Sequence, residues 1–181
     1  MSTHHKIRKR YEIAQQARFL TCSCFQRLPL FDNDAIKQAF VEELRRSRER
    51  THFQLVAWVI MPEHVHLVIV PELPEFPVSK ALSDLKGQFA GRVLRRWREL
   101  GAPVLARLVD GMGKQRFWQV GGGYDRNVYR DAELIEKVQY MHSNPQARGL
   151  VSDALNWPWS SARWYAGLRG NAPIDIDQSA W

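Results

Sequence analysis

The 181-residue sequence contains few cysteines and no long apolar run. Its two cysteines, Cys22 and Cys24, are separated by one residue, which is too close for an ordinary structural disulfide. No stretch approaches the roughly 20 apolar residues that cross a bilayer, and the basic segment MSTHHKIRKRYEIAQQ lacks the apolar core of a secretory signal. We therefore expect a reduced, cytoplasmic protein.

Internal repeats, low-complexity segments and a nucleotide-binding P-loop are also missing. The segment GMGKQR, residues 111–116, lacks the full pattern that a P-loop requires. The chain instead combines 45% hydrophobic residues and seven tryptophans with 26 Lys and Arg against 19 Asp and Glu, a net charge of +7. This composition predicts one folded domain, and its charge favours a polyanionic partner, nucleic acid before anionic lipid.

Hydrophobic periodicity predicts strands that alternate with helices. Either Asp32 or Asn33 can cap the first helix, and Pro145 should end the last one because the residue before a proline avoids the helical region. In chain order we expect a strand over 18–26, a helix to about residue 50, a hairpin of strands 52–60 and 64–70, a helix over 79–100, a strand over 116–120, the turn GGGYDRN and a helix over 131–143. This order predicts an α+β fold of ferredoxin-like type, an antiparallel sheet with helices packed on one face.

Two histidines lie close together in the apolar run VAWVIMPEHVHLVIVPE. Side chains alternate along a strand, so His64 and His66 share one face while Val65 points to the other. Their Cα atoms are then about 6.5–7 Å apart, from which both imidazoles can converge on one cation. Two alternatives stay open: a solvated sheet face with no ligand, and a structural zinc that recruits Cys22 and Cys24, although such cysteines more often only pack.

Two other known types of histidine site do not match this sequence. A metallo-β-lactamase site would continue as His-x-His-x-Asp-His, whereas this chain continues with LVI. A two-histidine phosphodiesterase needs two separate His-x-Thr/Ser motifs, and neither His52 nor His142 supplies one. On the last predicted helix, Tyr140 and Asn144 are four residues apart and therefore share a face.

Four motifs, in this order and spacing, resemble those of the IS200-like single-tyrosine transposases: WVIMPEHVHLVI, RFWQVGGGYDRNVYRD, YMHSNPQARGLV and WPWSSARWY. They are most similar to the branch of the REP-associated tyrosine transposases. The resemblance spans residues 18–165, which we expect to form the transposase domain, between a basic N-terminal arm over 1–17 and a C-terminal tail over 166–181. It implies the HUH fold and site: two histidines around a hydrophobic residue, a divalent metal, and a tyrosine on a helix.

Carried over to this sequence, the resemblance implies that Tyr140 is the nucleophile and that His64, His66 and Asn144 bind Mg²⁺ or Mn²⁺. Glu63 stands where family members often have Asn, and it adds a negative charge beside the metal. The implied activity is that of a metal-dependent endonuclease and strand transferase on single-stranded, hairpin-containing DNA, acting in DNA transposition. The resemblance is compatible with a monomer or a homodimer.

The chemistry is consistent with these residue types. A divalent cation on a phosphate oxygen withdraws charge and orients phosphorus for in-line attack. A phenol, whose ordinary pKa is near 10, attacks as it loses its proton. Tyr124 and Tyr129 are alternative nucleophiles by residue type, but Tyr124 follows a glycine turn and Tyr129 has Glu133 four residues on instead of an asparagine.

Basic residues are candidates for contact with the DNA backbone. The set comprises Lys86, Arg92, Arg116, Arg126 and Arg148, together with the arm from Lys6 to Arg10. Phe117 and Trp118 are candidates for stacking on unpaired bases, and the alternative for Trp118 is the core. The rival functions are a non-catalytic nucleic-acid-binding module and a domesticated hairpin-binding protein on the same fold.

Overall fold

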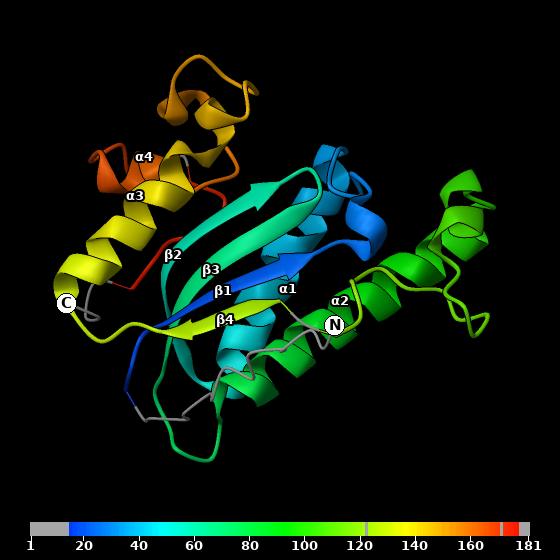
Figure 1. Cartoon of the computed structure of the whole chain (residues 1–181), viewed down its shortest axis with the longest axis horizontal. Helices are drawn as coiled ribbons and strands as arrows, with labels where there is room; N and C mark the ends of the chain where they lie inside the picture. The colour runs from blue at the N-terminus through cyan, green and yellow to red at the C-terminus, as the bar shows by residue number, and fades with distance from the viewer. Residues whose placement is uncertain (1–14, 122, 171, 178–181) are drawn as a thin grey trace, which may run out of the picture.

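Four antiparallel strands form the central sheet, in the spatial order β2-β3-β1-β4 (Figure 1). The computed structural model describes residues 15–121, 123–170 and 172–177. Its strands are β1 (Arg18–Ser23), β2 (Phe53–Met61), β3 (His64–Pro71) and β4 (Tyr124–Asn127). One helix joins β1 to β2 and another joins β3 to β4, which is the β-α-β-β-α-β connection of ferredoxin-like folds. The predicted α+β fold with an antiparallel sheet is confirmed.

The first two helices begin and end close to the expected positions, and the third begins where expected. They are α1 (Asp34–Thr51), α2 (Val78–Glu99), α3 (Asp131–Ala147) and α4 (Ala162–Tyr165), with 3-10 turns at Phe25–Arg27, Pro103–Leu108 and Ala154–Asn156. Asn33 caps α1, since its side-chain oxygen accepts a hydrogen bond of 2.7 Å from the backbone N–H of Ala35. In the described part of the chain, no helix is long and apolar enough to span a membrane.

The two faces of the sheet are covered by different helices. One face, with Leu20 and Leu67, packs against α1 and α2. The other face, with Phe19 and Val68, packs against α3 (Figure 1). The expectation that the helices lie on one face therefore holds for α1 and α2 and is wrong for α3. The physical reason is that both faces of the central strands are apolar, so a second layer must cover the second face.

The strand expected over 116–120 does not form, and the predicted turn contains β4 instead. Phe117 and Trp118 do not alternate between two faces, because both are buried in an aromatic cluster with Phe31 and Phe89. Trp118 makes only an isolated bridge to Cys24. The following residues, 124–127, pair with β1 and form the edge of the sheet.

Helix α3 continues through Pro145 to Ala147, so its expected end at residue 143 is wrong. A proline's fixed φ angle is close to the helical value, so the backbone stays helical through Pro145 at the cost of one N–H bond in the last turn. The last turn closes with a 3.0 Å bond from the Arg148 N–H to the Asn144 carbonyl and a 2.9 Å bond from the Leu150 N–H to the Pro145 carbonyl. Asn144 consequently lies within the helix, one turn beyond Tyr140.

Candidate active site

The paired histidines project from β3 on the face that α3 covers. Strand alternation places His64 and His66 on this face and Val65 on the opposite one. Each histidine is only 5% exposed, and their Nε2 atoms are 3.0 Å apart. The sequence prediction of a shared face therefore agrees with the geometry.

The second nitrogen of each ring has its own partner. Nδ1 of His64 is 3.2 Å from Oε1 of Glu63, and Nδ1 of His66 is 2.8 Å from the hydroxyl of Thr21. Partners of this kind fix the orientation of metal-binding histidines. The sequence analysis missed Thr21, which lies directly opposite His66 in the register of β1 and β3. The alternation of β1 could have placed Thr21 on the correct face, but only the register reveals its partner.

Helix α3 brings Tyr140 and Asn144 to the histidines. The Asn144 amide nitrogen is 3.2 Å from Nε2 of His66, and Asn144 is 8% exposed. The ring centroid of Tyr140 is 5.8 Å from that of His66, and Tyr140 is 54% exposed. The apolar residues Leu134, Val138 and Met141 bury the adjacent strip of α3 against the sheet. That packing sets the height of α3 above the two histidines.

Phe19 from β1 contacts the rings of both His66 and Tyr140 from the sheet side. Its ring stacks on His66 at 5.3 Å between centroids and meets Tyr140 edge-on at 6.4 Å. Phe19 is itself buried, at 4% exposure. It was not identified from the sequence, where it is one apolar strand residue among several. The arrangement limits the orientations open to His66 and Tyr140.

Burial keeps both histidines neutral. Burial, and secondly the proximity of His64, lowers the pKa of His66 to about 3. The pKa of His64 is also lowered, chiefly by burial, although the Glu63 carboxylate acts in the opposite direction. Neutral imidazoles present nitrogen lone pairs, which is the form that binds a cation.

The donor set fits a divalent cation. A separation of 3.0 Å between the two Nε2 atoms matches two ligands at right angles on an ion with bonds of about 2.1 Å. In the described residues, no group of three or more His, Cys, Asp or Glu side chains could hold a metal. The Asn144 side-chain amide lies 3.2 Å from Nε2 of His66, and rotation of that amide by half a turn would present its oxygen to a cation held by the two rings.

The zinc alternative with Cys22 and Cys24 is wrong. Both thiols are free and buried in the core on the α1 and α2 side, whereas the histidines occupy the α3 side. Burial raises the pKa of Cys22 to about 11. The cysteines pack in the core, which is the other alternative given for them in the sequence analysis.

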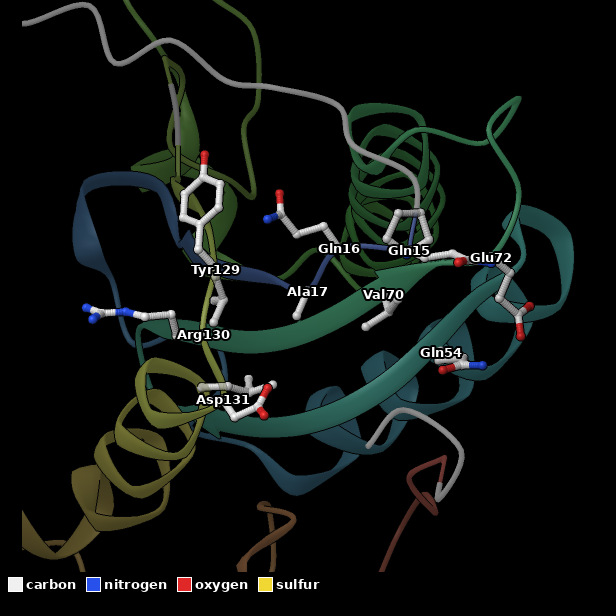
Figure 2. A pocket seen from close by; sticks show the side chains of 12 residues that line it. Gln15, Gln16, Ala17, Gln54, Val70, Glu72, Tyr129, Arg130 and Asp131 are labelled. Carbon is white, nitrogen blue, oxygen red and sulfur yellow. The ribbon is translucent and has the colours of Figure 1, made fainter.

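The other candidate tyrosines have different surroundings. Tyr129 is 61% exposed and lies just before α3, at the opposite end of that helix from Asn144. It lines an open cavity of about 780 Å³ with Gln16, Gln54 and Arg130 (Figure 2). Tyr124 packs edge-on against Phe19 at 5.8 Å. Hydrogen bonding to Tyr124 is the main cause of the raised pKa of Arg126.

Three of the predicted DNA-contacting residues form ion pairs within the protein. Arg126 and Arg148 are half exposed and pair with Glu133 at 2.8 Å and Glu63 at 2.9 Å. Arg92 instead binds the buried Glu43 at 2.7 Å between α1 and α2. Those three arginines already have protein partners.

Two further basic candidates border a cavity of about 580 Å³ between α2 and residues 115–121 and 123–125. Lys86 lies over the Trp118 ring, and Arg116 pairs with Asp110 at 2.7 Å. Phe117 and Trp118 are buried at 1% and 7% exposure, so the core interpretation holds and the base-stacking interpretation does not. The arm from Lys6 to Arg10 lies outside the described residues.

The chain is similar to known transposases. The family model "Transposase IS200 like" matches residues 12–143. A REP-associated tyrosine transposase of Escherichia coli K12 is 27% identical over 123 residues, which cover 68% of this chain and 62% of that protein. A Haemophilus influenzae protein whose name assigns it to the same group is 27% identical over 128 residues, covering 67% and 68%. The solved structure of a REP-associated tyrosine transposase bound to a REP hairpin covers 96% of this chain and 92% of its own, with a TM-score of 0.68 and 21% identity, which shows a shared fold.

Proposed function

Because this chain belongs to the IS200-like transposases, we propose that it cuts and rejoins single-stranded DNA beside a hairpin, with Tyr140 as the nucleophile. The observation that carries the proposal is the contact of the half-exposed Tyr140 ring with His66, one of two buried histidines whose Nε2 atoms converge. A nucleophile that attacks DNA must be accessible, and Tyr140 is 54% exposed. The hairpin in the structure of the similar protein supports hairpin DNA as the substrate.

In the proposed reaction, the Tyr140 hydroxyl oxygen attacks a DNA phosphorus. A tyrosyl O–P bond forms as the P–O3′ bond breaks, which leaves a 5′-phosphotyrosyl link and a free 3′-hydroxyl. The phenol loses its proton to solvent, and the departing 3′ oxygen takes up a proton. Attack by another 3′-hydroxyl reverses these steps and rejoins DNA, so the bond energy is conserved and no ATP is needed.

The other residues of the site would bind the cation and orient the nucleophile. His64, His66 and Asn144 would bind Mg²⁺ or Mn²⁺, which when bound polarises a phosphate oxygen and orients the phosphorus. Tyr140 and Asn144 are four residues apart, so α3 keeps nucleophile and ligand at a fixed spacing of about 6 Å along its axis. Phe19 restricts the Tyr140 ring from the sheet side.

The test is covalent trapping on labelled hairpin DNA with single-stranded flanks, in Mn²⁺, followed by mass spectrometry of the peptide adduct. Tyr140→Phe should abolish the adduct while the Kd for the hairpin changes by less than about twofold. Tyr129→Phe is the matched control and should retain the adduct, because Tyr129 is equally exposed but far from the histidines along α3. An adduct that survives in Tyr140→Phe contradicts the proposal. Hairpin binding without any adduct in the unsubstituted protein would favour a non-catalytic hairpin-binding protein.

A further inference from the structure

Glu63 connects the two halves of the site. It lies at the turn between β2 and β3, directly before His64, and its side chain is 11% exposed. Its Oε1 atom is 3.2 Å from Nδ1 of His64 and 2.9 Å from Nη2 of Arg148. One carboxylate oxygen therefore contacts both the histidine hairpin and the residue that caps the C-terminal end of α3.

The contact with Glu63 determines the tautomer of His64. An ionised carboxylate only accepts hydrogen bonds, so Nδ1 of His64 must carry the hydrogen. Nε2 then keeps its lone pair, and it is the atom that faces His66 at 3.0 Å. The contact of His66 with Thr21 fixes no tautomer, because a hydroxyl both donates and accepts. Glu63 is therefore the group that keeps the lone pair on Nε2 of His64 available to bind a cation.

The ion pair with Arg148 places a positive charge beside the Glu63 carboxylate. A nearly buried carboxylate without a partner is strongly unfavourable. Arg148 follows α3 directly, and it comes four residues after Asn144. The ion pair consequently joins the end of the tyrosine-bearing helix to the hairpin that carries the histidines.

We infer that Glu63 is a positioning residue, which holds His64 in its ligand form and, through Arg148, holds the end of α3 against the histidine hairpin. The inference rests on the proposed function only where it names these groups as cation ligands and nucleophile. Arg148 then has a structural role in the site besides its candidate role at the DNA backbone.

The first test uses the metal-free protein and nitrogen-15 NMR of the histidine rings. The unsubstituted protein should show His64 protonated at Nδ1, and Glu63→Ala should give a mixture of tautomers. Glu63→Gln keeps an oxygen that accepts from Nδ1 and should restore the Nδ1–H form. Asp110→Asn is the matched control, because Asp110 is also 11% exposed and also pairs with an arginine. An unchanged tautomer in Glu63→Ala, or an equal change in the control, overturns the inference.

The second test measures Mn²⁺ binding by electron paramagnetic resonance, with no DNA present. Glu63→Ala should weaken Mn²⁺ binding by about 10-fold or more, as loss of an outer partner of a ligand histidine does. Arg148→Ala should accelerate hydrogen exchange in the last turn of α3, which Asp110→Asn should leave unchanged. Unaltered Mn²⁺ affinity in Glu63→Ala, or unaltered exchange in Arg148→Ala, contradicts the inference. Neither readout depends on the Tyr140 adduct, so failure of the proposed function remains distinguishable.

Discussion

The ring of Tyr140 meets the ring of His66 edge-on, with 5.8 Å between centroids and 64° between planes. The two residues come from different elements, α3 and β3, and both also contact Phe19. One partner is half exposed and the other is 5% exposed. The phenol is therefore accessible from the surface while the histidine stays shielded from water, which strengthens electrostatic interactions at this point, and the proposed function requires both properties.

Replacement of Thr21 by valine should weaken cation binding. Thr21→Val keeps the side-chain shape but removes the hydroxyl that lies 2.8 Å from Nδ1 of His66. We expect Mn²⁺ affinity to fall by about 10-fold and the free energy of unfolding to fall by about 1 kcal/mol, measured by metal titration and urea denaturation. Thr51→Val is the control, since it removes a buried hydrogen bond to the Ser47 carbonyl far from the site. If both variants lose Mn²⁺ affinity equally, the role of Thr21 is not specific.

Replacement of Gly123 by alanine should disturb the same site from the backbone. A Cβ atom at Gly123 would lie 1.7 Å from the Thr21 carbonyl oxygen, so either β1 or the chain before β4 must move. We expect Gly123→Ala to lower the melting temperature and to weaken Mn²⁺ binding. Gly91→Ala is the control: nothing lies within 4 Å of a Cβ there, and alanine in a helix should stabilise the protein by about 0.5–1 kcal/mol. A Gly123→Ala protein as stable as the unsubstituted one would contradict the close approach.

Local patterns predicted the parts of the site that come from one element. The period of two in a strand placed His64 and His66 on one face, and the period of 3.6 in a helix placed Tyr140 with Asn144. The sequence resemblance connected the two pairs. The ferredoxin-like order of strands also followed from the chain order of the elements.

Partners across the sheet could not be predicted in this way. Thr21 and His66 are 45 residues apart, and their contact depends on the register of β1 against β3. The position of α3 on the second face depends on which helix buries Phe19, and periodicity does not contain that information. Trp118 illustrates the same limit, since its pattern was equally compatible with base stacking and with the core.

Acid should destabilise the fold through the partly buried His142 and the buried His66. Burial lowers the pKa of His142 from 6.5 to about 4 in the folded protein. Between these two values the unfolded chain binds more protons than the folded one, so the free energy of unfolding falls as pH falls. The slope should reach about 1.4 kcal/mol per pH unit for one such histidine, and His66 adds to it. Below about pH 4 the term from His142 is fully lost.

Urea denaturation as a function of pH measures this effect. His142 lies on α3 and its Nε2 is 2.8 Å from the Ser161 hydroxyl, which also hydrogen bonds to the backbone of Trp58. His142→Gln removes the titrating group and should make the acid slope shallower, with a residual slope from His66. An identical slope in His142→Gln would show that His142 does not contribute.

The ion pair between Arg18 and Asp125 should hold β4 on the sheet. Arg18 Nε and Nη2 contact the two Asp125 carboxylate oxygens at 2.8 and 2.6 Å, and the side chains are 1% and 8% exposed. Asp125→Ala removes the two-bonded ion pair of a buried guanidinium, so we expect a loss of about 3–5 kcal/mol in the free energy of unfolding. Hydrogen exchange should accelerate at residues 124–127, because among the strands that the structure describes β4 pairs with β1 alone.

The control for this prediction is an exposed ion pair. Arg96 and Glu99 are 65% and 54% exposed and 3.3 Å apart, so Glu99→Ala should change stability by less than about 0.5 kcal/mol.

Loss of β4 should also remove the contact between Tyr124 and Phe19, and thereby loosen His66 and Tyr140, which both pack on Phe19. Asp125→Ala should therefore reduce the DNA adduct more than its effect on hairpin affinity explains. A stable Asp125→Ala protein with normal exchange at 124–127 would show that backbone pairing alone holds this edge strand.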